Sequence, residues 1–218
     1  MTVKAYEASD NVVVYDFETL SQEATKGVVV SLALLNFNED RFLANPYTYE
    51  GLLAKTKMIK FDVKDQVDNY GRKVNRDTLN WWKKQSPEAR KQLIPSKERD
   101  VPITKLYDWF VVNTMKSNIK KVYTRGNTFD PIFMTYLMID INKPEPYPWW
   151  TIRDTRSMID GMTYGSDISN KFIPDGLKEK FIAHDPRHDI VMDVMRLQVL
   201  AQSIEGYEPS NLDDEIPF

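Results

Sequence analysis

The sequence predicts a mixed α/β fold, in which a sheet is flanked by helices, on three observations. Two apolar runs near the start, at residues 12–15 and 28–35, are typical of buried strands. Later segments with helical apolar spacing alternate with two short strand candidates. Hydrophobic residues make up 42% of the 218 residues, which is enough for one domain with a sizeable core.

The elements follow in order along the chain. We expect strands at residues 11–18, 28–36, 58–63, 121–124 and 149–153. We expect helices at residues 77–84, from Ser86-Pro87 onward, at 102–116, at 130–141, from Asp154-Thr155 onward, and at 186–204. Residues 37–57 give no clear pattern, and Gly71 marks a turn in the polar stretch 65–75. We therefore expect residues 1–204 to form one domain, followed by a short acidic tail at 205–218.

Composition narrows the classes of function. The chain has no cysteine, so disulfides and thiolate metal sites are excluded and a reducing cytoplasm is expected. No stretch is long and apolar enough to span a membrane, and we expect no membrane partner. The net charge of −3 does not draw in nucleic acid, so binding to it requires local basic patches or bound cations.

The first candidate site is the end of the first strand. Side chains alternate across a strand, so Asp16 and Glu18 point to the same side. Two neighbouring carboxylates at the end of a buried strand repel each other and lose hydration. A divalent cation such as Mg²⁺ or Mn²⁺ offsets that cost, whereas a lone D-x-E pattern is by itself more often a strand that ends in a polar loop.

The second candidate site is Asp130, in the stretch that begins Gly126-Asn127. An Asp before Pro131 is by itself an ordinary helix N-cap. Its position just after a predicted strand makes it a candidate, because ligands of α/β sheets gather at the carboxyl ends of strands.

The third candidate site lies at the start of the last helix, where two H-x-x-x-x-D pairs overlap. His188 with Asp193 is preferred, because Asp193 lies on the apolar stripe of the helix with Ile190 as a neighbour. His188 in the first turn suits a neutral base, since the helix dipole disfavours imidazolium there. His184 with Asp189 remains the alternative pair.

Together, the three motifs in this order resemble the DnaQ-like (DEDDh) 3′–5′ exonuclease family, across roughly residues 11–204. The stretch Thr78 to Ser86 resembles the branch that contains phage exonuclease A and related bacterial exoribonucleases. The resemblance implies a ribonuclease H-like mixed sheet of five strands. It also implies a cytoplasmic location, which is the host cytoplasm if the chain is phage-encoded.

The resemblance further implies a metal-dependent nuclease. Asp16, Glu18, Asp130 and Asp193 are expected to hold two divalent cations, Mg²⁺ or Mn²⁺, with His188 as the general base. The expected substrate is single-stranded DNA with a free 3′ end, from which nucleoside monophosphates are released. The alternatives are a 3′–5′ exoribonuclease, a non-catalytic nucleic-acid-binding domain of the same fold, and, ranked lowest, a small-molecule phosphohydrolase.

The expected substrate-binding residues lie mostly in or just after the first motif. They are Phe17, Thr19, Leu20, Asn127 and Trp81. Trp81 has the π-face for stacking on a base, although a Trp81-Trp82 pair is slightly more often part of a core.

The tail ends in six residues, from Asp213 to Phe218, that resemble the acidic C-terminal tip of bacterial single-stranded DNA-binding proteins. In that family the tip docks onto repair and replication proteins. An apolar ring beside a proline and three acids suits docking onto a basic rim. The tail is therefore expected to recruit proteins that recognise this tip, or to fold back onto the basic surface of the enzyme itself.

Overall fold

The computed structural model describes residues 10–114 and 119–204, and its centre is a mixed sheet of six strands. The strands, in the spatial order β4-β3-β2-β1-β5-β6, are β1 (Val12–Thr19), β2 (Val29–Phe37), β3 (Lys57–Phe61), β4 (Asp100–Val101), β5 (Lys121–Thr124) and β6 (Ile152–Asp154). The predicted mixed sheet is confirmed, but the predicted number of five strands is wrong. The additional strand, β4, has two residues beside β3, which is too short to show an alternating pattern.

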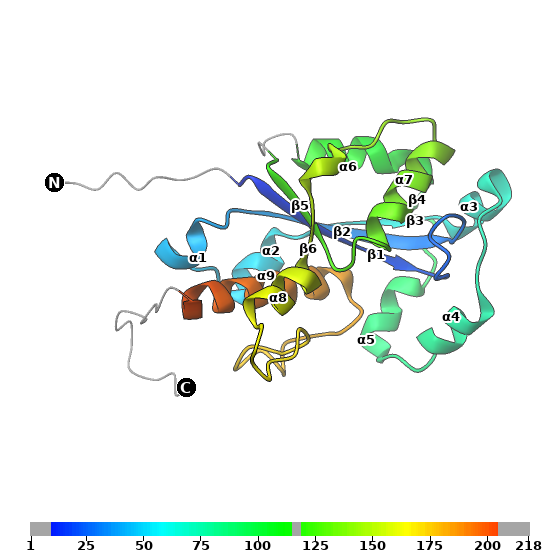
Figure 1. Ribbon diagram of the computed structural model, residues 1–218. Coiled ribbons are helices and arrows are strands. Elements are labelled where there is room, and N and C mark those ends of the chain that lie inside the picture. Colours follow the sequence, from blue (N-terminus) through cyan, green and yellow to red (C-terminus); the bar gives the residue numbers. More distant parts are fainter. Residues whose placement is uncertain (1–9, 115–118, 205–218) are drawn as a thin grey trace.

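Helices cover both faces of this sheet. The described helices are α1 (Arg41–Ala44), α2 (Tyr49–Lys55), α3 (Val63–Tyr70), α4 (Arg76–Trp82), α5 (Pro87–Arg90), α6 (Leu106–Thr114), α7 (Asp130–Asp140), α8 (Thr155–Met162) and α9 (Pro186–Ile204). Short 3₁₀ turns occupy residues 91–93, 103–105 and 149–151. In Figure 1, α6 and α7 lie above the sheet, whereas α8 and α9 lie below it.

The helix α3 was not predicted, because its sequence is mostly polar. Asp62 caps its start by accepting hydrogen bonds from the backbone N–H groups of Lys64 and Asp65. The helix ends at Gly71, which adopts the left-handed conformation with φ of 63°. The turn expected at Gly71 is therefore the end of a helix.

Strand β1 lies in the middle of the sheet and is buried on both faces. Val12 and Val14 pack in the same hydrophobic cluster as the apolar side of α9. Val13, Tyr15 and Phe17 pack on the opposite face, with residues of α6 and α7. The alternation of β1 therefore turns its even-numbered residues toward α9.

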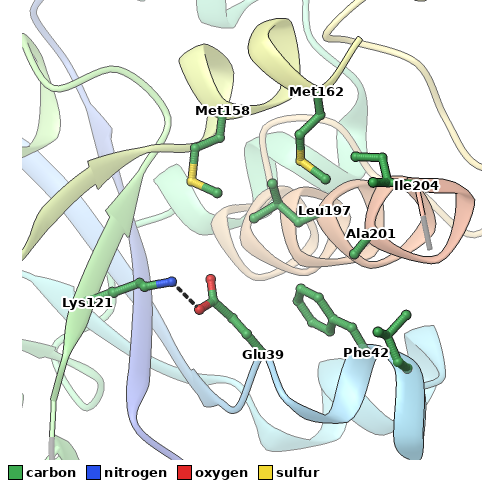
Figure 2. Close-up of a pocket in the computed structure, with 9 residues that line it drawn as sticks. Glu39, Phe42, Lys121, Met158, Met162, Leu197, Ala201 and Ile204 are labelled. Carbon is green, nitrogen blue, oxygen red and sulfur yellow. Dashed lines mark hydrogen bonds and ion pairs between the residues drawn. The ribbon is translucent and has the colours of Figure 1, made fainter.

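A separate apolar pocket of about 330 Å³ lies at the C-terminal end of α9. Figure 2 shows Leu197 and Ala201 of α9 facing Met158 and Met162 of α8 across it. The ion pair between Lys121 and Glu39, 2.5 Å long, borders it on one side. In the described part of the chain, no helix is long and apolar enough to cross a membrane.

Candidate active site

A cleft of about 1110 Å³ opens at the edge of the sheet where β1 and β5 end. These two strands run parallel, so their carboxyl ends lie at the same edge. Six carboxylate side chains line the cleft: Asp16, Glu18, Asp77, Asp130, Asp189 and Asp193.

Asp16 and Glu18 both lie on the α9 side of β1, where strand alternation predicts them to be. Burial raises the pKa of Asp16 well above its usual value, and the charges of Asp130 and Glu18 raise it further. Burial likewise raises the pKa of Glu18, and the charge of Asp189 is the largest electrostatic contribution. The two carboxyl groups therefore sit where negative charge is costly.

Asp130 is the first residue of α7 and comes from the other side of the sheet. Its side chain does not cap the helix as expected, because Phe129 holds the N-cap position. Instead, the backbone N–H of Phe17 donates to Asp130 Oδ1 over 3.0 Å. Burial raises the pKa of Asp130 to about 7, against the lowering effect of that hydrogen bond, and the charge of Asp193 adds to the rise. Asp130 thus reaches the backbone between the two acids of β1.

His184 and Asp189 complete this group of charges at the start of α9. Ligand atoms of Glu18, His184 and Asp189 all lie within 4.8 Å of one another. The backbone N–H of His184 donates to Asp189 Oδ2 over 2.9 Å. Burial raises the pKa of Asp189 to about 7, with a further contribution from Asp193, whereas burial lowers the pKa of His184.

The position of His184 is fixed by contacts to its backbone and its ring. Its φ of 65° is unusual for a residue other than glycine. Gln92 Nε2 donates to the His184 carbonyl oxygen over 2.5 Å, and Gln92 Oε1 accepts from the Ser31 hydroxyl over 2.8 Å. The ring centroid of Trp81 lies 4.7 Å from that of His184 in an edge-on contact. These contacts aim the imidazole at the acids.

His188 lies outside the cleft, which contradicts its predicted pairing with Asp193. Its Nδ1 lies 2.7 Å from the Tyr49 hydroxyl, in the interface between α2 and α9. Both His188 and Asp193 are helical, and residues five apart on a helix are rotated by about 140° from each other. The side chains of His188 and Asp193 therefore cannot both point into the same site. His184 precedes the helix and is free of this limit.

Asp193 lines the cleft, but its carboxylate oxygens already have partners. Its Oδ1 accepts from Arg125 Nη1 and from Arg196 Nη1, each over 2.7 Å. Its Oδ2 accepts from the Thr155 hydroxyl over 2.5 Å. Asp193, which is predicted as a metal ligand from its place on the apolar stripe of α9, is therefore held between two guanidinium groups.

Comparisons with known proteins decide the family. The family model described as the Rv2179c-like 3′-5′ exoribonuclease domain matches residues 11–190. The chain belongs to this family. The exonuclease is also 30% identical to the exodeoxyribonuclease of enterobacteria phage T4, over 93% of this chain and 94% of that protein. The predicted DnaQ-like 3′–5′ exonuclease is thereby confirmed.

Solved structures of exonuclease I share the fold of this exonuclease. The zinc ion bound form of an E. coli exonuclease I–ssDNA complex matches with a TM-score of 0.54 and 12% identity, over 92% of this chain and 41% of that one. An exonuclease I/SSB-Ct complex matches with a TM-score of 0.53 and 10% identity, over 92% and 42%. This chain therefore spans about two fifths of the exonuclease I chains.

The predicted substrate-binding residues of the exonuclease divide into two groups. Phe17, Thr19 and Trp81 line the cleft. Leu20 does not line it, because its side chain packs in a small core with Trp82. Asn127 is exposed and is not among the residues that line the cleft, although Thr124 Oγ1 lies 3.4 Å from its Oδ1.

A row of basic side chains on the cleft was not predicted as part of the site. Its members are Arg125, Arg156, Lys171 and Arg196. Arg125 directly follows β5, so the rule that placed Asp130 at the strand end also applies to Arg125. Arg196 lies one helical turn after Asp193, the spacing at which oppositely charged side chains meet. The sequence offers no comparable indication for Lys171, in a long irregular segment.

The acids of the exonuclease fit divalent cations. Asp16, Glu18, Asp130 and Asp189 all have raised pKa values, because burial and mutual repulsion disfavour their ionised forms. Bound cations would reverse that balance. Carboxylate oxygens are the ligands that Mg²⁺ and Mn²⁺ prefer.

Proposed function

We propose that this 3′–5′ exonuclease releases nucleoside 5′-monophosphates from the 3′ end of single-stranded DNA. The observation that carries the proposal is that four acids with raised pKa values and His184, whose pKa is lowered, line one cleft, with ligand atoms of Glu18, His184 and Asp189 within 4.8 Å of one another. Relative to the sequence-based prediction, Asp189 replaces Asp193 as the fourth ligand and His184 replaces His188 as the base. The T4 relative supports DNA as the substrate, since it is named an exodeoxyribonuclease.

His184 serves as the general base in this proposal. Because burial lowers its pKa, its imidazole is neutral near pH 7 and has a nitrogen free to accept a proton. The attacking water gives its proton to His184 while its oxygen forms a bond to phosphorus. The bond from phosphorus to the 3′ oxygen breaks, and that oxygen takes a proton from solvent water to become the new 3′ hydroxyl, while His184 later returns its proton to solvent. Gln92 holds the base in place during this transfer.

Asp16, Glu18, Asp130 and Asp189 would hold two divalent cations, Mg²⁺ or Mn²⁺. When bound, such cations neutralise the four acids, lower the pKa of the attacking water and stabilise charge on the leaving oxygen. The residues of this chain contribute the orientation. The hydrogen bond from Phe17 N–H leaves Asp130 Oδ1 fixed beside β1, and the N–H of His184 similarly fixes Asp189.

RNA is the second candidate substrate, because the matching family model is described as an exoribonuclease domain. The two polymers differ in the 2′-hydroxyl, which a protein reads by a direct polar contact at the sugar. Thr19, Gln22 and Thr78 are polar residues that line the cleft, and the Thr19 hydroxyl donates to the Ser21 carbonyl oxygen. A preference for RNA would assign one of these groups to the 2′-hydroxyl.

The test uses two single strands of identical length and base order, one of DNA and one of RNA, each labelled at the 5′ end. With Mn²⁺ or Mg²⁺, the DNA strand is expected to shorten one nucleotide at a time and to release 5′-monophosphates. EDTA is expected to stop the reaction, and Asp189→Asn is the inactive control. Faster shortening of RNA would transfer the proposal to the alternative substrate.

A chain that binds both strands without shortening either would overturn the catalytic proposal and leave a nucleic-acid-binding domain. The presence of all four acids and His184 in one cleft argues against that alternative. The same reaction mixtures decide it, since an electrophoretic shift measures binding on the undigested strands.

We also propose that the residues from Asp213 to Phe218 bind proteins that recognise the C-terminal tip of single-stranded DNA-binding protein. These residues lie outside the part of the chain that the structure describes, so the proposal depends on their sequence. It is supported by the exonuclease I/SSB-Ct complex, in which a protein of the same fold binds an SSB-Ct segment.

A further inference from the structure

Asp193 is a buried acid that joins two arginines from different elements. Its side chain is 3% exposed, whereas those of Arg125 and Arg196 are 20% and 7% exposed. Arg125 follows β5 and Arg196 lies on α9, so Asp193 offsets the repulsion between two like charges brought close together. Such a charge cluster is retained only where its hydrogen bonds are satisfied.

The same two arginines bind the backbone of a third part of the chain. Arg125 Nη2 donates to the Asn170 carbonyl oxygen over 2.8 Å and to Asn170 Oδ1 over 3.2 Å. Arg196 Nε donates to the Phe172 carbonyl oxygen over 2.6 Å, and its Nη2 lies 3.4 Å from the Lys171 carbonyl oxygen. Three consecutive carbonyl groups therefore depend on guanidinium donors held by Asp193.

These contacts hold a segment of the chain that has no regular secondary structure. Residues 163–185, between α8 and α9, form neither a helix nor a strand. Within this segment Lys171 and Ile173 line the cleft, and both side chains are exposed. The cation of Lys171 and the apolar group of Ile173 thus face the space where a polynucleotide strand would lie, although regular hydrogen bonding does not fix them.

We propose that Asp193, Arg125 and Arg196 are positioning residues that hold the cleft wall at residues 170–173 for binding the substrate strand. The inference rests on the proposed function and refines it. His184 is held independently, by Gln92 and by Asp189. Loss of this charge cluster should therefore weaken binding of the strand more than it slows the chemical step. Asp193 acts through the two arginines and binds no cation.

The test is a double-mutant cycle on single-stranded DNA with Mn²⁺. Arg125→Gln and Lys171→Gln are each expected to raise KM about tenfold, since one charge-assisted contact is lost, while kcat stays within about threefold. The KM of the double variant should be little higher than that of Arg125→Gln. Once residues 170–173 are no longer held in place, Lys171 should contribute little to binding. Each single variant should also reduce the salt dependence of binding by about one counterion.

Additive effects of the two substitutions would overturn the proposal, because Arg125 would then contact the strand directly. Arg125→Lys is a matched variant: it keeps the charge but cannot bridge Asp193 and Asn170, so it should recover KM only in part. Full recovery would contradict the bridging role. A wild-type chain that does not shorten DNA or RNA refutes the proposed function itself, which separates the two failures.

Cation binding gives a readout that does not depend on activity. Asp193→Asn should bind the same number of Mn²⁺ ions as wild type in calorimetry, whereas Asp189→Asn should bind fewer. Loss of Mn²⁺ from a folded Asp193→Asn chain would make Asp193 a ligand and overturn the proposal. If Asp193→Asn does not fold, the double-mutant cycle of Arg125 and Lys171 is sufficient to test the proposal.

Discussion

Replacing Asp130 by Asn should stabilise the cation-free protein at pH 8. The pKa of Asp130 rises from its usual 3.8 to about 7 in the folded chain. A carboxyl group with a raised pKa costs stability above its unfolded pKa, and the cost disappears as the pH falls through the folded value. At pH 8 that rise corresponds to about 4 kcal/mol, which sets the upper limit for the gain.

The substitution keeps the local geometry, since the Asn side-chain oxygen still accepts from the Phe17 N–H. The assay is urea unfolding in EDTA, followed by circular dichroism at pH 8 and pH 5. Between these values the cost of the wild-type carboxylate falls from about 4 to about 2 kcal/mol, so the advantage of the variant should shrink. Asp108→Asn, which changes an exposed acid on α6, is the control and should leave stability nearly unchanged.

A variant that is less stable than wild type at pH 8, or equally advantaged at both pH values, would refute this reasoning. Added Mn²⁺ provides a second comparison. It should stabilise the wild-type chain, because a ligand that binds only the folded state raises stability, and it should stabilise Asp130→Asn less.

Three further outcomes are expected. His184→Ala should lower kcat by about 10²–10⁴-fold while His188→Ala changes it little, as measured on single-stranded DNA; the reverse order would restore the original pairing. Gln92→Leu should lower kcat with little change in KM, because it frees the His184 backbone, and an unchanged kcat would show that Trp81 holds the ring alone. Deleting residues 216–218 should abolish pull-down of proteins that recognise the SSB tip and leave nuclease activity unchanged. A rise in activity would indicate self-inhibition.

Patterns that depend on local sequence predicted much of this structure. The placement of Asp16 and Glu18 follows from alternation along one buried strand, and the start of α9 follows from Asp185-Pro186. Short elements such as α1 and β4 escaped prediction, because four or two residues show no period. Their conformation depends on contacts with distant residues.

The error at the third motif has a definite physical cause. The position of Asp193 on the apolar stripe of the helix correctly predicts that this acid is buried. Burial does not say which partner satisfies the acid, and the sequence does not reveal that Arg125 reaches it from the end of β5. Helical rotation alone, however, would have separated His188 from Asp193 and favoured His184.

The acids of the cleft come from the beginning, the middle and the end of the chain. Asp16 lies on the first strand, Asp130 follows the fifth, and Asp189 lies on the last helix. A ribosome completes this site only after almost the whole described chain has been made. Prematurely terminated products that end before residue 184 lack both His184 and the fourth acid. The proposed site is incomplete in such fragments, and we therefore expect them to lack nuclease activity.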